Sequence, residues 1–321
     1  MALKFSIVIP VKDLNHYLKE SIPVLLALPE KNFDIFLLPD EYGGAAKNKP
    51  VQPRLYAKDP FFSSMSGFKK HGSRLRLIPT GSTGPASKRD MAAKLSRADV
   101  LAFLDDDAYP DRHWLGVANR YFSRGEDALG GPAVTPPRVS ALEEASGLVF
   151  ETFLGGGLYR FRYRSVGKSF LVDDFPTVNL LVRRKAFLKV GGFDTRYWPG
   201  EDTKFCLDFT RAGYTIRYVP ELVVWHHRRP LFGSHLRQIS AYARHRGFFA
   251  KRFPKTSLRL SYFMPTFFLA GLLAGWIPGF FFEEVLWLYG GVVLVYFLVN
   301  AVNGWVLAKG GSFSRRLLLT M

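Results

Sequence analysis

A chain of 321 residues is long enough for one large domain with an appendage, or for two modest domains. Hydrophobic residues make up 48% of the chain and aromatic residues 15%, a composition that excludes a disordered protein. The formal net charge of +17 favours anionic partners, either nucleic acid or membrane headgroups. We favour the membrane, because several basic residues crowd together just before an apolar block: Arg244, Arg246, Lys251, Arg252, Lys255 and Arg259.

The amino-terminal residues predict a βαβ unit. Residues 5–11 (FSIVIPV) form a continuous apolar run, as strands buried on both faces do, and residues 33–38 form a second such run. A helical stretch at about 14–28 lies between them, so the two strands are expected to be parallel. The first strand is not preceded by the apolar stretch and cleavage site of a signal peptide, so we expect the soluble part in the cytoplasm.

The next segment predicts a loop, a helix and another buried strand. Residues 43–72 are rich in Gly, Lys, Pro and Ser and are expected to be a long surface loop, followed by a short strand at 75–79. A helix is predicted at 87–96 and a buried strand at 100–104, which ends on three consecutive aspartates. In open α/β sheets ligands bind beyond the carboxyl ends of the strands, so the acidic triplet is well placed for a site.

The middle of the chain is less regular than the first part. A helix is predicted after Arg183, and another begins near Gly200. Strands are predicted at 216–219 and 222–225. Two histidines and two arginines follow the last of these strands directly, at residues 226–229.

Two uncharged stretches near the carboxyl end predict a transmembrane helical hairpin. They cover residues 262–282 (21 residues) and 285–308 (24 residues), and each exceeds the roughly 20 residues that cross a hydrocarbon core. Only Glu283 and Glu284 separate them. Basic residues flank both outer ends, so the positive-inside rule places those ends in the cytoplasm. A pair of buried core helices is the alternative.

These patterns divide the chain into four parts. Residues 236–249 mix aliphatic and aromatic residues with Arg and His, as helices in a membrane interface do, and an ordinary amphipathic surface helix fits nearly as well. The predicted parts are a soluble α/β domain at 1–234, an interfacial region at 235–260, a transmembrane hairpin at 261–308 and a basic, apolar tail at 309–321.

Polar residues after two strands predict a metal site. Asp105 and Asp107 are alternate residues at a strand end and point the same way, so both carboxylates can bind one hard cation such as Mg²⁺ or Mn²⁺. His226 or His227 is expected at the same edge of the sheet, where a neutral imidazole suits Mn²⁺. Arg228 follows and suits a polyanion. A plain acidic surface turn is the alternative.

Glu201 and Asp202 stand at the start of a predicted helix. A carboxylate there is stabilised by the helix dipole, so an N-terminal cap explains the pair as well as a functional role does. The functional interpretation is a general base that removes a proton from a hydroxyl group. The sequence lacks the phosphate-loop pattern and the dinucleotide-binding fingerprint.

Taken in order, these pieces resemble the family 2 glycosyltransferases of the GT-A fold, over about residues 5–229. Four stretches carry the resemblance: FSIVIPVKDLNHYLKESI, GPASKRDMAAKLSRADVLAFLDDDAYPDRHWL, VNLLVRRKAFLKVGGFD and WPGEDTKFCLDFTRAGYTIRYVPELVVWHHRR. The resemblance implies an α/β fold with a mixed, mostly parallel sheet flanked by helices. It also implies inverting, metal-dependent transfer of a sugar from a nucleotide-sugar donor.

The family pattern implies a role for each matching residue. The donor nucleotide would be bound by Pro10, Val11, Asp40, Lys88, Arg89, Asp90, Asp105, Asp106 and Arg228. The Asp-x-Asp signature, Asp105 and Asp107, would bind Mn²⁺ or Mg²⁺ together with one of the two histidines, and we favour His226 over His227. Asp202 would be the catalytic base, with Glu201 beside it. Trp198, Arg160 and Arg162 would contact the acceptor, although a solvated basic face explains the two arginines equally well.

The residues after Arg229 resemble members of the family with C-terminal membrane helices, which build bacterial surface polysaccharides. We therefore expect transfer to a hydroxyl of a lipid-linked glycan at the inner (cytoplasmic) membrane, with the catalytic domain facing the cytoplasm. The expected partners are the sugar donor, the acceptor and membrane lipids, and not nucleic acid. Two alternatives stay open: a polyprenyl-phosphate glycosyltransferase, and a non-catalytic, membrane-bound polyanion binder.

Overall fold

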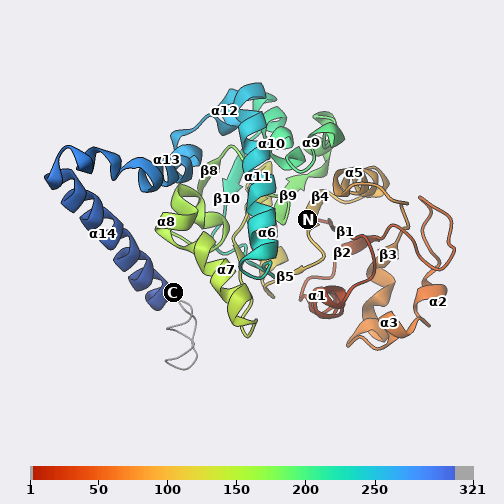
Figure 1. The fold of residues 1–321 in the computed structure, drawn as a ribbon. Helices are drawn as coiled ribbons and strands as arrows, with labels where there is room; N and C mark the ends of the chain where they lie inside the picture. The colour runs from red at the N-terminus through yellow and green to blue at the C-terminus, as the bar shows by residue number, and fades with distance from the viewer. Residues whose placement is uncertain (1–2, 308–321) are drawn as a thin grey trace. The chain divides into compact units, whose positions relative to one another are not determined.

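The computed structural model describes residues 3–307, and the chain divides into two compact units. The first unit comprises Met1–Val134 and Arg164–His227, and the second comprises Thr135–Tyr163 and Arg228–Met321. Figure 1 labels the helices and strands of both in chain order. The segment Thr135–Tyr163, which lies within the predicted soluble part at 1–234, groups with the carboxyl-terminal helices.

An eight-stranded mixed sheet, counted over residues 3–307, forms the centre of the first unit. Its order is β3-β2-β1-β4-β9-β6-β10-β8. The strands are β1 (Phe5–Pro10), β2 (Phe33–Leu38), β3 (Leu75–Leu77), β4 (Val100–Leu104), β6 (Ala128–Gly130), β8 (Phe170–Val172), β9 (Asn179–Arg183) and β10 (Ile216–Tyr218). Neighbours from β3 to β4 are parallel, as are β6 and β10, whereas β9 is antiparallel to both β4 and β6 and β8 is antiparallel to β10.

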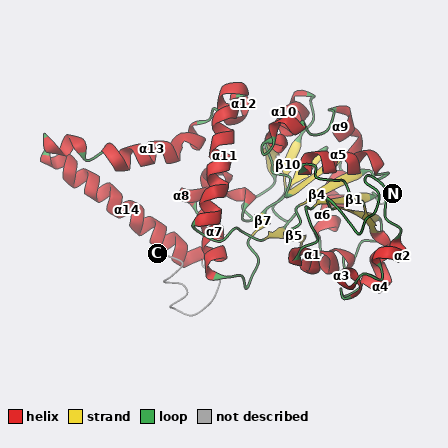
Figure 2. Cartoon of the chain, turned by 45° about the vertical axis from the view of Figure 1, so that its right-hand side comes forward, coloured by secondary structure: helices red, strands yellow, loops and turns green. Residues whose placement is uncertain are grey.

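Helices cover both faces of this sheet, which explains why its central strands are apolar throughout. Figures 1 and 2 show α1 (His16–Leu26) and α6 (Trp114–Phe122) on one face, and α5 (Pro85–Leu95), α9 (Arg184–Lys189) and α10 (Glu201–Arg211) on the other. Every residue of β1 and β4 is buried. The predicted strands at 5–11, 33–38 and 100–104 are thereby confirmed to within one residue.

Each face has its own apolar core. On the first, Leu18, Ile22, Leu25 and Leu26 of α1 are buried at the spacing of one helical face. On the second, the ring of Phe103 lies 5.3 Å from that of Phe187 and 5.3 Å from that of Phe193. Aromatic pairs at this separation contribute beyond their buried area.

The prediction of a surface loop at 43–72 is wrong. The segment contains three four-residue helices, α2 (Pro53–Tyr56), α3 (Pro60–Ser63) and α4 (Phe68–His71). Tyr56, Phe62 and Phe68 are buried, with the rings of Phe62 and Phe68 stacked 5.3 Å apart. Proline at the first position of α2 and α3 favours helix initiation there, because its fixed φ is helical and its missing N–H is not needed.

A second, three-stranded sheet completes the first unit over the described residues. Its order is β5-β11-β7, with β5 at Ala108–Pro110, β7 at Ala133–Val134 and β11 at Val224–His226. The strand β11 runs antiparallel to β5 and parallel to β7. Only the three residues of the acidic triplet separate β4 from β5, so the small sheet extends directly from the triplet.

The second unit is helical within residues 3–307. It contains α7 (Ala141–Glu151), α8 (Phe153–Gly156), the 3₁₀ turn η2 (Gly157–Arg162), α11 (Gly233–Arg252), α12 (Pro254–Ser257), α13 (Leu260–Ala274), the 3₁₀ turn η4 (Ile277–Phe280) and α14 (Glu283–Leu307). The predicted amphipathic helix at 236–249 is confirmed as part of α11.

Two helical stretches of the described chain, Leu260–Phe280 and Glu283–Val306, are long and apolar enough to cross a membrane. They run in opposite directions and diverge from their connection (Figures 1 and 2). Two contacts join them: the Tyr289 hydroxyl donates to the Leu272 carbonyl at 2.8 Å, and the rings of Phe268 and Tyr296 stack 4.3 Å apart. Ala308 and the predicted tail at 309–321 lie outside the described residues.

Two details of the predicted hairpin are corrected. The first stretch is interrupted, since α13 ends at Ala274 and the 3₁₀ turn η4 follows. Glu283 and Glu284 do not form the turn but open α14. Carboxylates are favourable there, because the first turn of a helix carries the positive end of its dipole.

Candidate metal centre

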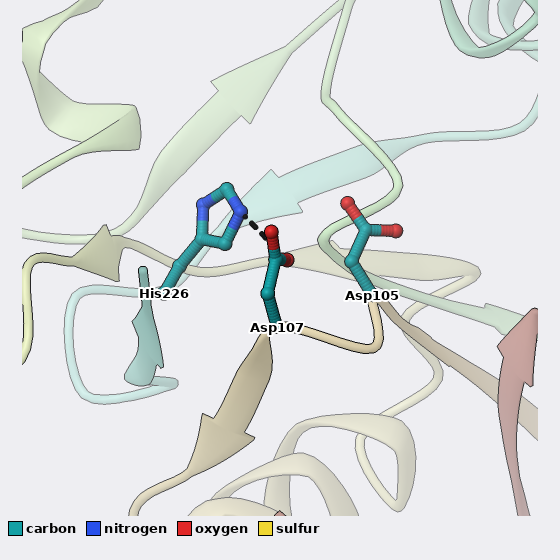
Figure 3. Close-up of side chains that lie close together, drawn as sticks. All are labelled: Asp105, Asp107 and His226. Carbon is teal, nitrogen blue, oxygen red and sulfur yellow. Dashed lines mark ion pairs between the residues drawn. The ribbon is translucent and has the colours of Figure 1, made fainter. Parts of the chain in front are cut away.

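The acidic triplet forms a tight turn between β4 and β5. The Ala108 backbone N–H donates to the Asp105 carbonyl at 3.2 Å, so the chain reverses within four residues. Figure 3 shows the side chains of Asp105 and Asp107 next to each other. The sequence predicted this pairing from strand alternation, but the turn produces it.

The register of the small sheet brings an imidazole to this turn. His226 lies opposite Ala108 in the β5–β11 ladder, and the His227 backbone N–H donates to the Asp107 carbonyl at 3.0 Å. As a result, Nε2 of His226 lies 3.1 Å from Oδ1 of Asp107 (Figure 3). The predicted strand at 222–225 is wrong at its end, because His226 is the last residue of β11 and does not follow it.

Asp105, Asp107 and His226 can hold a divalent ion. One ligand atom from each lies within 4.8 Å of the other two. Two ligands bonded at about 2.1 Å to the same ion are at most about 4.2 Å apart, so small side-chain rotations close the site. Two carboxylates and one neutral imidazole form a donor set that suits Mn²⁺ and accepts Mg²⁺.

His227 is turned to a different partner. Its Nε2 lies 2.8 Å from Oε2 of Glu20, and its ring lies 4.9 Å from that of Tyr17. Both of these residues belong to α1. Of the two candidate imidazoles, the structure therefore brings His226 to the aspartates.

Asp106 is not among the three metal-ligand candidates and has a partner of its own. Its carboxylate accepts a hydrogen bond from the side-chain amide of Asn15, the residue that also caps α1. Burial, followed by the negative charges of Asp107 and Asp105, raises the pKa of Asp106 to about 6. Asn15 had no place among the sequence-predicted residues, although its position as a polar cap just before α1 could have drawn attention to it.

Arg89 links the acidic turn to α10. Its Nη2 lies 2.7 Å from Oδ1 of Asp105 and its Nη1 lies 3.4 Å from Oε1 of Glu201. Both Arg89 and Glu201 are buried. Burial raises the pKa of Glu201, although the positive charge of Arg89 opposes the shift.

Asp202 is half-buried at the start of α10. Its Oδ1 accepts a hydrogen bond from the Thr203 backbone N–H at 2.7 Å, so the carboxylate meets the positive end of the helix. The Thr203 hydroxyl in turn donates to Asp174 at 3.1 Å. The N-terminal position predicted for Glu201 and Asp202 is confirmed.

Lys88 joins the carboxyl ends of β1 and β2. Its Nζ donates to the Val11 carbonyl at 2.6 Å, to the Leu38 carbonyl at 3.1 Å and to the carboxylate of Asp40. An ammonium group has three N–H donors, and all three are used here. The structure thus brings together Val11, which follows Pro10, with Asp40 and Lys88.

Asp90 and Trp198 also belong to the first unit. Oδ1 of Asp90 accepts a hydrogen bond from the Phe193 backbone N–H at 2.9 Å, and burial raises the pKa of this carboxyl to about 6 despite that bond. The indole of Trp198 is 60% exposed in the segment before α10. An exposed aromatic ring is available to a ligand in a way that a buried one is not.

Three predicted arginines belong to the second unit. The guanidinium of Arg228 lies 5.1 Å from the Tyr163 ring, and its backbone N–H donates to Glu143 at 3.1 Å. Arg160 lies over Phe153 at 5.5 Å, and Arg162 over Tyr159 at 4.8 Å. Each guanidinium is therefore held by an aromatic neighbour.

Comparisons with known proteins agree with this architecture. The family described as glycosyl transferase family group 2 matches residues 100–307. The pre-mycofactocin glycosyltransferase of Mycobacterium tuberculosis (strain ATCC 25618 / H37Rv) is 31% identical over 150 residues, which are 46% of this chain and 31% of that protein. Glycosyltransferase AglE of Haloferax volcanii is 28% identical over 168 residues, 50% of each chain. The chain thus spans about a third to a half of the length of these relatives.

Solved structures show the same fold. The mannosyltransferase PcManGT from Pyrobaculum calidifontis, in complex with GDP-Man and Mn²⁺, matches with a TM-score of 0.53 at 16% identity, over 99% of this chain and 79% of that one. GalNAc-T7 with UDP, GalNAc and Mn²⁺ matches with a TM-score of 0.53 at 14% identity, over 80% and 52%. At such low identity the likeness is one of fold, and it confirms the mixed α/β architecture expected from the sequence.

Proposed function

We propose that this chain, which belongs to glycosyl transferase family group 2, transfers a sugar from a nucleotide-diphosphate donor to a hydroxyl group of a lipid-linked glycan. One observation carries the proposal: Asp105, Asp107 and His226 converge at the carboxyl end of a central strand. Ligands of open α/β sheets bind at that edge.

Mn²⁺ is the proposed cofactor, with Mg²⁺ as a substitute. PcManGT and GalNAc-T7, which share the fold, were both solved with Mn²⁺ and a nucleotide or nucleotide sugar. An ion held by the three side chains would supply positive charge to the donor diphosphate, which becomes more negative as it leaves the sugar.

Buried basic residues support donor binding beside this site. Lys88 fixes the ends of β1 and β2 against Asp40, and this rigid edge is where we place the nucleoside. Arg89 holds Asp105 in one orientation and keeps a positive charge next to it. Pro10, Asp90, Asp106 and Arg228 complete the proposed donor site on the strength of the family pattern.

Asp202 is the proposed catalytic base. Its carboxylate lies at a helix N-terminus, where the dipole favours the ionised form that a base requires. It would remove the proton of the acceptor hydroxyl, whose oxygen then attacks the anomeric carbon from the face opposite the diphosphate and inverts it. Glu201 would act through Arg89, since its carboxylate is buried against that guanidinium.

The acceptor is placed at a membrane surface. Two stretches of the described chain are apolar and long enough to cross a bilayer, and basic residues precede the first of them. A glycan carried on a lipid would reach the catalytic unit from that surface, and the cytoplasmic face of the inner membrane is the proposed location. Trp198, Arg160 and Arg162 are the proposed acceptor contacts.

A ligand screen on the full chain tests the proposal. We expect nucleoside diphosphates with Mn²⁺ to raise the melting temperature, since a ligand at 100 times its Kd stabilises by about 2.7 kcal/mol. The variants Asp107→Asn and His226→Gln should abolish this rise in melting temperature. The imidazole of His227 pairs with Glu20 instead, so His227→Gln should keep the rise. If no nucleoside diphosphate stabilises the wild type in the presence of Mn²⁺, the proposal is wrong.

A second experiment separates hydroxyl acceptors from phosphate acceptors. A polyprenyl phosphate is already an anion and needs no base, so Asp202→Asn would leave its glycosylation intact. For a hydroxyl acceptor we expect the same variant to lose roughly 10²–10⁴-fold in rate, the usual contribution of a general base. Both acceptors should be assayed in the same membranes with the same donor.

A further inference from the structure

Two tyrosines stack where the first apolar stretch begins. Tyr159 lies in η2 and Tyr262 in the first turn of α13, and their rings are 4.8 Å apart and within 2° of parallel. The Ser261 hydroxyl donates to that of Tyr159 at 3.4 Å. The stack therefore fixes the start of α13 against η2, inside the second unit.

Arginines gather around this stack. The guanidinium of Arg162 lies 4.8 Å from the Tyr159 ring, and that of Arg246, on α11, lies 4.7 Å from the Tyr262 ring. Arg259 immediately precedes α13, and its Nη2 donates to the Lys255 carbonyl at 2.9 Å. Tyr159, Arg162, Arg246, Arg259 and Tyr262 together are called the arginine–tyrosine cluster below.

The cluster is strongly electropositive. Burial tends to raise the pKa of Tyr159, yet hydrogen bonds from Ser261, Tyr262 and Arg259 outweigh it and lower that pKa. Arg162 is buried, whereas Arg246 and Arg259 are half-buried and present part of their surface to solvent. Arg246 and Arg259 are therefore more accessible to an external anion than Arg162 is.

We propose that the arginine–tyrosine cluster binds the phosphate group of a membrane lipid. Arg259 directly precedes the stretch Leu260–Phe280, so a bilayer around that stretch has its phosphate layer next to the cluster. Guanidinium groups pair with two phosphate oxygens at once, and the Tyr–Tyr stack holds Arg246 in place beforehand, which lowers the entropic cost of binding.

The lipid phosphate has two possible sources, and both share this chemistry. One is a phospholipid of the bilayer, and the other is a polyprenyl phosphate. The inference rests on the part of the proposed function that puts Leu260–Phe280 in a membrane, and it does not need sugar transfer. The lipid-binding experiment and the nucleotide-binding experiment therefore test the two proposals separately, because nucleotide binding is measured without lipid.

Native mass spectrometry of the full chain in neutral detergent tests the inference. Phosphatidic acid, polyprenyl phosphate or phosphatidylcholine is added, and the fraction of chain that retains one lipid is measured. We expect the chain to retain phosphatidic acid and polyprenyl phosphate. The double variant Arg246→Gln/Arg259→Gln should lower the affinity for both lipids at least tenfold, since each basic residue near a lipid surface raises the affinity about fivefold.

A matched control removes the same charge elsewhere. Arg120 and Arg124 both lie over the Tyr121 ring, at 6.0 and 5.9 Å, on the exposed surface of the first unit. Arg120→Gln/Arg124→Gln should retain phosphatidic acid as the wild type does. Equal losses in the two double variants, or no loss in either, would overturn the proposal. Tighter retention of polyprenyl phosphate than of phosphatidic acid assigns the site to that lipid, and equal retention assigns it to the bilayer.

A measurement on the wild type covers the case in which the double variant does not fold. Phenylglyoxal modifies accessible arginines, and the modified positions can be mapped by peptide mass spectrometry. Phosphatidic acid should slow the modification of Arg246 and Arg259 at least threefold and leave Arg120 unaffected. Uniform protection of all three, or none at Arg246 and Arg259, counts against the site.

Discussion

At the scale of residues, the candidate site depends on charges held in pairs. Arg89 is the clearest case, because it is buried between Asp105 of the acidic turn and Glu201 of α10. The guanidinium offsets two carboxylates that would otherwise repel each other. Arg89 therefore links the acidic turn to α10.

We expect Arg89→Met to destabilise the protein by about 3–5 kcal/mol, since removal of one partner leaves a buried charge uncompensated. The melting temperature without metal measures the loss. Arg196→Met is the control: its pair with Asp194 is exposed, and such pairs contribute about 1 kcal/mol or less. Equal effects in the two variants would show that Arg89 is not the link described here.

The raised pKa of Asp90 predicts that the stability of the protein depends on pH. Its folded-state pKa of about 6 is above the ordinary value of 3.8, so the folded protein binds the proton more tightly than the unfolded chain. The contribution of the protonated Asp90 carboxyl to the free energy of unfolding is therefore fully present below pH 4 and is lost as the pH rises through 6.

Asp90→Asn removes this titration and keeps an oxygen for the Phe193 backbone N–H. The variant should melt at a higher temperature than the wild type at pH 8 and at the same temperature at pH 4. Asp194→Asn should show the opposite sign, a small loss at pH 8, because Arg196 lowers the pKa of Asp194. A constant difference between Asp90→Asn and the wild type across this range would mean that the carboxyl does not titrate as described.

At the scale of elements, strands buried on both faces were predictable and short helices were not. The runs at 5–11 and 100–104 are uniformly apolar, and that pattern has few alternatives. The helices at 53–56, 60–63 and 68–71 are each about one turn long, too short for a helical period to show. Their buried aromatic residues stand among lysines and glycines, so the segment resembled a loop.

The metal centre was predictable in composition but not in geometry. Carboxylates and imidazoles after apolar strands indicated the ligands. The choice of His226 over His227 follows from the β5–β11 register, and a one-residue shift along a strand turns a side chain to the other face. The Arg89–Glu201 pair joins residues 112 positions apart, a contact that only the folded chain creates.

The backbone that leads into β11 packs tightly against Gly131. A Cβ at Gly131 would lie 1.8 Å from the Leu222 carbonyl oxygen and 2.7 Å from Nδ2 of Asn179. Asn179 is fully buried and donates to that same carbonyl at 2.6 Å. A side chain at position 131 would therefore displace the segment that leads into β11.

We expect Gly131→Ala to destabilise the protein by about 2–3 kcal/mol, as overpacking does, and to weaken Mn²⁺ binding as well because β11 carries His226. Melting temperature and Mn²⁺ titration by electron paramagnetic resonance measure the two effects. Gly247→Ala, inside α11 with open space around it, should instead gain about 0.5–1 kcal/mol. A stable Gly131→Ala protein with unchanged Mn²⁺ affinity would contradict this role.

At the scale of the whole molecule, the chain joins two units with different physical demands. The first buries its apolar residues inside an α/β core, whereas the second leaves many large apolar side chains of Leu260–Phe280 and Glu283–Val306 exposed. Exposed apolar surface of this extent is stable in a bilayer, whereas in water it promotes aggregation. Under the proposed function, these two stretches would hold the chain at a membrane.

The orientation of the hairpin gives the last prediction. Cys206, the sole cysteine, is buried, so a cysteine introduced at the surface can be labelled with little background. If both outer ends face the cytoplasm, a membrane-impermeant maleimide added to intact cells should label Glu283→Cys, in the first turn of α14 between the two apolar stretches. Lys255→Cys, before α13, should be labelled only after the membrane is permeabilised. The reverse pattern would place the catalytic unit outside, away from cytoplasmic nucleotide sugars, and labelling of both cysteines in intact cells would show that the hairpin does not span the membrane.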